Sequence, residues 1–95
     1  MELLGSVKLE LKVLKQLFRN GALSAATVVP ASIESDRWLV VIETKHGLHE
    51  RMTRANSKKE KLFRSLPAAF EDLRRIGFKQ ATVTFPNEDV PIRKR

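Results

Sequence analysis

Cysteine is absent from this chain of 95 residues, so neither disulfides nor thiolate metal sites can stabilise the fold. Apolar runs are short, and the longest, residues 38–42, falls far below the roughly 20 residues that span a bilayer. The N-terminus lacks the basic start and the long apolar stretch of a secretory signal. We therefore expect an unprocessed cytoplasmic protein, without membrane contact, that is stabilised by its hydrophobic core.

Arrangements of residues that carry out catalysis are equally scarce. The two histidines, His46 and His49, flank a glycine turn and have no third ligand near them in sequence. No serine stands in a nucleophile elbow, and Glu71 and Asp72 are adjacent positions of a predicted helix, which point in different directions. The four glycines are scattered rather than gathered into a phosphate-binding loop. We expect no enzymatic activity, no metal and no cofactor.

Acidic residues are outnumbered, with 18 Lys and Arg against 11 Asp and Glu, which gives a net charge of +7. Hydrophobic residues make up 42% of the chain and charged residues 31%, a balance typical of a folded globular domain. We predict a single domain over residues 1–86 and a flexible basic tail over 87–95. An excess of positive charge on so small a surface attracts polyanions, although it also serves solubility.

Two periodicities compete at the start of the chain. Residues 7–13 alternate as a strand would, but the pattern from 6 to 20 fits a helix better, with Ser6 as its cap and Asn20-Gly21 as its stop. One stripe of this helix is apolar and is expected to pack on the sheet: Val7, Leu11, Leu14 and Phe18. The other stripe is basic: Lys8, Lys12, Lys15 and Arg19.

The middle of the chain predicts an antiparallel sheet. Residues 25–31 have strand composition, and Pro30 suggests a strand end or a sheet edge. Residues 38–42 are apolar on both faces, which predicts a central strand, and Gly47 allows a hairpin turn into a third strand over 48–54.

A second helix is predicted from its Ser65 cap to Gly77, and an alternating strand over 80–85 follows it. The buried stripe of this helix is expected to be Leu66, Phe70, Leu73 and Ile76. The fold class is therefore α+β in the order αβββαβ: an N-terminal helix, a three-stranded antiparallel meander, a second helix and a final strand, with the helices packed on the sheet.

Basic residues concentrate between positions 51 and 64, where six cations stand against one acid, Glu60. Lys and Arg clusters of this kind neutralise the phosphates of nucleic acids. A solvated loop and a solubilising tail explain the same residues without a partner. The predicted nucleic-acid-binding residues are Arg51, Arg54, Lys58, Lys59, Lys61, Arg64, Arg74, Arg75, Arg93, Lys94 and Arg95. Because most aromatic residues fall on core stripes, no base-stacking platform is expected.

Part of the sequence, residues 36–85, resembles small accessory proteins carried by plasmids and integrative elements, some of them associated with partition or replication. The resemblance is carried by Trp38-Leu-Val-Val-Ile, Gly47, Phe63-Arg64-Ser65-Leu66, Ala68-Ala69, Leu73 and Gly77-Phe78, followed by a valine strand. It implies a mobile-element context and no mechanism.

Two functions remain open from the sequence. The first is a non-enzymatic accessory protein that binds nucleic acid, DNA rather than RNA, through phosphate contacts. The alternative is a protein-interaction or dimerisation module without nucleic-acid binding, which would use strand 25–31 as an exposed sheet edge.

Overall fold

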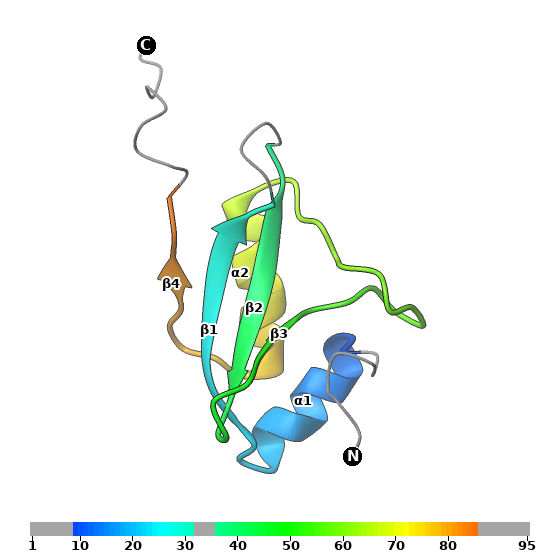
Figure 1. The fold of residues 1–95 in the computed structure, drawn as a ribbon, viewed down its shortest axis with the longest axis vertical. Helices are drawn as coiled ribbons and strands as arrows, with labels where there is room; N and C mark the ends of the chain where they lie inside the picture. Colours follow the sequence, from blue (N-terminus) through cyan, green and yellow to red (C-terminus); the bar gives the residue numbers. More distant parts are fainter. Residues whose placement is uncertain (1–8, 32–35, 86–95) are drawn as a thin grey trace.

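The computed structural model describes residues 9–31 and 36–85, which form two helices and four strands (Figure 1). In chain order these are α1 (Leu11–Arg19), β1 (Leu23–Pro30), β2 (Trp38–Thr44), β3 (His49–Arg51), α2 (Leu66–Ile76) and β4 (Thr82–Val83). The predicted α+β class is confirmed. No helix in the described ranges is long and apolar enough to cross a membrane.

The sheet has the strand order β3-β2-β1-β4 and is mixed. β1 pairs antiparallel with β2, and β2 pairs antiparallel with β3, whereas β4 pairs parallel with β1. The first three strands pair antiparallel in chain order as predicted, but the sheet is not the simple antiparallel meander expected, because the chain returns after α2 with β4 parallel to β1. The strand end suggested by Pro30 is confirmed, because β1 ends at this residue. The suggested sheet edge is wrong, because β4 pairs with β1 at Thr27 and Val28.

Both helices contribute to one core. Val28, Val40 and Ile42 alternate along β1 and β2 and are fully buried with residues of α1 and α2. Leu39 and Val41 point to the opposite face of the sheet, where the described chain places no helix (Figure 1). β2 is thus an inner strand, as its apolar composition predicted, but the helices cover it on one side.

α1 begins later than its pattern predicts. Its first residue is Leu11, and Glu10 takes the extended N-cap position without a side-chain cap, so a helix starting after Ser6 is wrong. Ser6, Val7 and Lys8 lie outside the described residues. The predicted stop is confirmed, because Gly21 has a φ of 77° and the Ala22 N–H donates to the Leu17 carbonyl over 2.9 Å.

α1 packs mainly against α2 rather than on the sheet. Leu14 is fully buried, and the Phe18 ring meets Phe78 edge-on with the ring centroids 4.9 Å apart. An added Cβ at Gly77, the residue after α2, would lie 2.6 Å from Phe18. The close approach of the two helices therefore depends on a residue without a side chain at this position.

α2 has the predicted ends and a different buried face. The Ser65 hydroxyl accepts from the Ala68 N–H over 3.3 Å, and Gly77 ends the helix with a φ of 133°. The buried residues are Ala69, Asp72, Leu73 and Ile76. The predicted burial of Phe70 is wrong, because its side chain is 36% exposed while Asp72 is only 6% exposed.

Two predicted strands are shorter in the structure. β3 ends at Arg51 instead of 54, and β4 comprises only Thr82 and Val83 instead of 80–85. Phe85, the last residue of the predicted strand, lies outside β4 and is 73% exposed. The predicted tail over 87–95 lies outside the described residues.

Candidate nucleic-acid interface

The charged loop predicted after β3 is a hairpin over residues 52–61, which we call the basic hairpin. Its two arms pair antiparallel through Thr53 and Glu60. The Arg54 N–H donates to the Lys59 carbonyl and the Lys61 N–H to the Met52 carbonyl, both over 3.0 Å. The backbone that carries these cations is therefore fixed by hydrogen bonds.

Cations at the base of the basic hairpin are neutralised within the fold. Arg51 forms an ion pair with Glu60. Lys61 Nζ lies 2.6 Å from Asp72 Oδ2, and this contact explains how the Asp72 carboxylate can be buried in α2. Two residues predicted to bind phosphate, Arg51 and Lys61, thus attach the hairpin to its neighbours.

The tip of the basic hairpin differs from its base. Arg54, Lys58 and Lys59 are exposed, and their side chains form no ion pair with any described residue. Exposed cations that form no ion pair keep their charge directed toward solvent. They are available to an external anion.

The first turn of α1 lies beside this tip (Figure 1). The Asn56 N–H donates to Glu10 Oε1 over 2.6 Å, which links the hairpin to the residue before the helix. A hollow between the two elements is lined by Lys12 and Lys15 from α1 and by Ala55 and Asn56 from the hairpin, with Glu10 and Leu11 as its other lining residues. Tertiary contact thus adds two lysines to the cations of the tip.

A second hollow continues from α1 to the end of α2. Lys15 and Arg19 border it from α1 and Arg75 from α2, with Phe18 and Ile76 as its other lining residues. Lys15 lines both hollows, and Arg54, Lys58 and Lys59 lie within three residues of Ala55 or Asn56 along the chain, so we group the cations of the three elements into one set. We call this set the basic surface: Lys12, Lys15, Arg19, Arg54, Lys58, Lys59 and Arg75.

Most members of the basic surface have no acidic partner. Lys12, Lys15 and Arg19 form no ion pair in the part of the chain that the structure describes. Arg75 is the exception, at 3.8 Å from Glu71 and 3.6 Å from Asp72. The surface is therefore positively charged along α1 and the hairpin tip and partly neutralised at α2.

The remaining predicted site residues lie elsewhere. Arg74 borders a different pocket, between α2 and β4. Arg64 precedes the first turn of α2, at the end of that helix opposite Arg75. Arg93, Lys94 and Arg95 lie outside the described residues.

The predicted site omitted Lys12, Lys15 and Arg19, although their helical spacing was visible in the sequence. That spacing indicates one face of a helix, but it does not say which other cations lie beside that face. The missing information was the contact between α1 and the hairpin tip.

Other chemistry finds little support in the described residues. They contain no group of three or more His, Asp or Glu side chains that could hold a metal ion. The two residues His49 and Glu43 approach each other to 3.8 Å on the surface. No protein-family model, curated protein or solved structure matches the chain.

Proposed function

We propose that this protein binds duplex DNA without catalysing a reaction, and that the basic surface contacts the backbone phosphates. The observation that carries the proposal is the contact between the hairpin tip and the start of α1, two elements that together carry six cations without an ion pair to any described residue. Each Lys or Arg that neutralises a phosphate releases a condensed counterion, which supplies most of the free energy of nonspecific binding.

Phosphate contact fits this surface better than base contact. The exposed aromatic rings are Phe70 and Phe85, and neither lines the hollows beside α1. Single-stranded nucleic acids are bound through stacking on such rings, whereas a duplex backbone requires only charge in the correct place. We therefore favour DNA duplexes over single strands, with little sequence preference.

The biological setting of this proposal comes from the resemblance of residues 36–85 to accessory proteins of mobile elements. A small basic protein that binds DNA nonspecifically fits a supporting role in partition or replication. The alternative, self-association through residues 25–31, is less favoured because β4 pairs with β1 at Thr27 and Val28 and so covers part of that edge.

The test is the salt dependence of DNA binding, measured by fluorescence anisotropy on a labelled duplex. The triple variant Arg54→Gln, Lys58→Gln and Lys59→Gln removes the cations of the tip. Each lost phosphate contact lowers the slope of log K against log salt by about 0.9, so we expect a decrease of about 2.7.

The matched control removes three exposed cations that lie outside α1 and outside the basic hairpin: Lys45→Gln, Arg64→Gln and Lys79→Gln. Both triple variants change the net charge equally. A larger decrease in DNA affinity and in its salt slope for the tip variant therefore identifies a localised binding site. Equal losses in the two triples would refute the basic surface, and no binding at about 50 mM salt would refute the function.

A further inference from the structure

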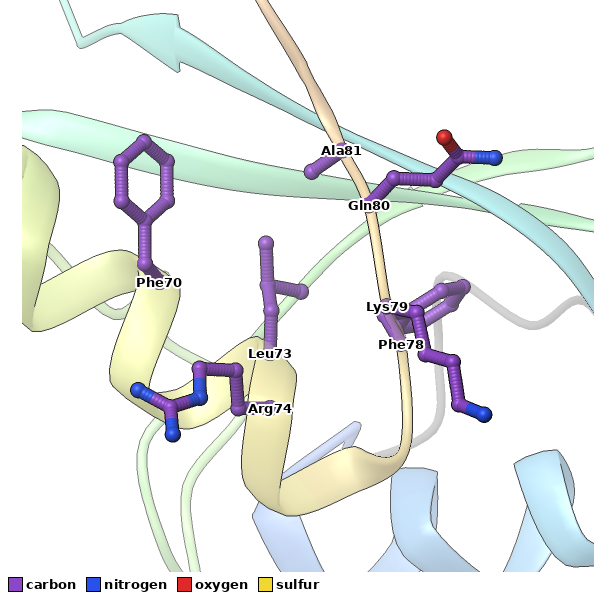
Figure 2. A pocket seen from close by; sticks show the side chains of 7 residues that line it. All are labelled: Phe70, Leu73, Arg74, Phe78, Lys79, Gln80 and Ala81. Atoms are coloured by element: carbon purple, nitrogen blue, oxygen red, sulfur yellow. The ribbon is translucent and has the colours of Figure 1, made fainter.

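A separate pocket of about 230 Å³ opens between α2 and the segment that leads into β4 (Figure 2). Phe70 and Leu73 point into it from the helix, and Ala81 stands on the other side. Its lining residues are Phe70, Leu73, Arg74, Phe78, Lys79, Gln80 and Ala81. We call this the α2–β4 pocket.

The floor of the α2–β4 pocket is apolar and part of it is exposed. Leu73 is buried and Phe78 packs against the core, whereas 36% of Phe70 remains exposed. A volume of about 230 Å³ accommodates one large apolar side chain rather than an extended cofactor. Exposed aromatic residues beside a concave apolar site are typical of protein interfaces.

The charges around the pocket are positive. In Figure 2 the Arg74 and Lys79 side chains extend to opposite sides of it. Lys79 has no acidic partner among the described residues. Arg74 is 3.9 Å from Glu71, longer than a hydrogen bond, and both side chains are largely exposed. This arrangement favours a ligand whose apolar group is flanked by acids.

The neighbouring strand provides a backbone for such a ligand. Among residues 9–31 and 36–85, β4 is an edge strand of the sheet and pairs with β1 on one side only. Ala81, which lines the pocket, immediately precedes it. A peptide that adds to a sheet edge gains affinity from main-chain hydrogen bonds and specificity from pockets for its alternate side chains.

We propose that the α2–β4 pocket binds an extended acidic peptide of a partner protein, which pairs with β4 and inserts one apolar side chain. The proposal is independent of DNA binding. Arg74 and Arg75 are consecutive helix residues, about 100° apart around the axis, so one serves this pocket and the other lies by the basic surface.

The experiment is selection of a phage-displayed library of random short peptides on the full-length folded chain. We expect the bound peptides to share an apolar residue flanked by Asp or Glu. Affinities of synthetic copies should fall by at least about tenfold in the double variant Arg74→Glu and Lys79→Glu, because like charges then face each other. In spectra of the ¹⁵N-labelled chain, the peptides should shift the amide signals of Ala81 and Val83.

Two matched variants keep the result interpretable. Lys45→Glu and Arg64→Glu together make the same charge change away from the pocket and should leave peptide affinity unchanged. Phe70→Ala should weaken binding while the urea unfolding midpoint stays near wild type, because Phe70 is partly exposed.

The proposal is overturned if no peptide is enriched, if the enriched peptides lack acids, or if both charge-reversal pairs bind equally. Light scattering of the chain alone tests whether a second copy of the chain occupies the pocket instead. A dimer that dissociates in the Phe70→Ala variant would show that a second copy, rather than a partner's peptide, covers the pocket.

Discussion

The base and the tip of the basic hairpin are built from the same residue types and differ in what surrounds them. At the base, Arg51 and Lys61 face the carboxylates of Glu60 and Asp72. At the tip, the cations are exposed to solvent, and the neighbouring Ala55 and Asn56 share a hollow with Lys12 and Lys15 of α1. The base therefore stabilises the fold, whereas the tip contributes charge without a structural partner.

This difference shows why a count of charges along the sequence overestimates the binding site. Residues 51–64 contain six cations. Two of them are paired with acids, and a third, Arg64, lies away from the others. The positive surface is instead completed by α1, a segment distant in sequence.

The largest effect is expected from Leu14→Ala. This residue is fully buried and holds α1, with its part of the basic surface, in the core. A buried leucine replaced by alanine costs about 2–5 kcal/mol of unfolding free energy, out of roughly 5–15 kcal/mol for a domain. A urea melt measures the change. A neutral result would mean that α1 is not anchored in the core.

Lys61→Ala tests the structural role of the hairpin base. It removes the closest cation to the buried Asp72 carboxylate and leaves only Arg75 at 3.6 Å. A hydrogen bond to a charged group contributes about 1.5–3 kcal/mol, which is the expected loss of stability. Lys58→Ala, at the tip, is the control and should change the unfolding free energy by less than about 0.5 kcal/mol. Equal decreases in unfolding free energy for Lys61→Ala and Lys58→Ala would show that the base and the tip do not differ in their structural role.

Glu10→Gln tests how the tip is held against α1. Glu10 Oε1 accepts the Asn56 N–H over 2.6 Å, and an ionised acceptor forms a bond roughly twice as strong as a neutral one. We expect a loss of about 1 kcal/mol and faster hydrogen exchange at the Asn56 amide. Unchanged exchange at Asn56 would show that the hairpin keeps its position without this contact.

The smallest effect on stability is expected from Lys12→Gln with Lys15→Gln, within about 0.5 kcal/mol, because neither forms an ion pair in the described chain. The same variant should weaken DNA binding and lower its salt slope by about 1.8. Anisotropy titrations at several salt concentrations measure both. Normal DNA binding would restrict the interface to the hairpin tip.

Local signals in the sequence predicted the elements and several of their ends. Gly21 and Gly77 end the two helices because positive φ angles are required there, and Ser65 caps α2 through its own hydroxyl. The predicted start of α1 was wrong. The alternation around Leu9 and Leu11 is compatible with a strand or a helix, and the choice between them depends on packing.

The buried face of α2 shows a limit of hydrophobic patterns. The pattern assigned Phe70 to the core and ignored Asp72, yet the structure buries the carboxylate and leaves the ring partly exposed. Lys61 lies eleven residues earlier and compensates the buried charge. A periodicity analysis of one helix cannot include a partner that lies outside the helix.

The sequence by itself determined the α+β class, the order of helices and strands, and the excess of positive charge, because these depend on composition and on contacts within a few residues. The tertiary structure alone decided that β4 returns parallel to β1, which cations are neutralised, and that α1 lies beside the hairpin tip. The physical reason is that these properties depend on contacts between residues far apart in the chain, such as Glu10 with Asn56, which no local pattern encodes.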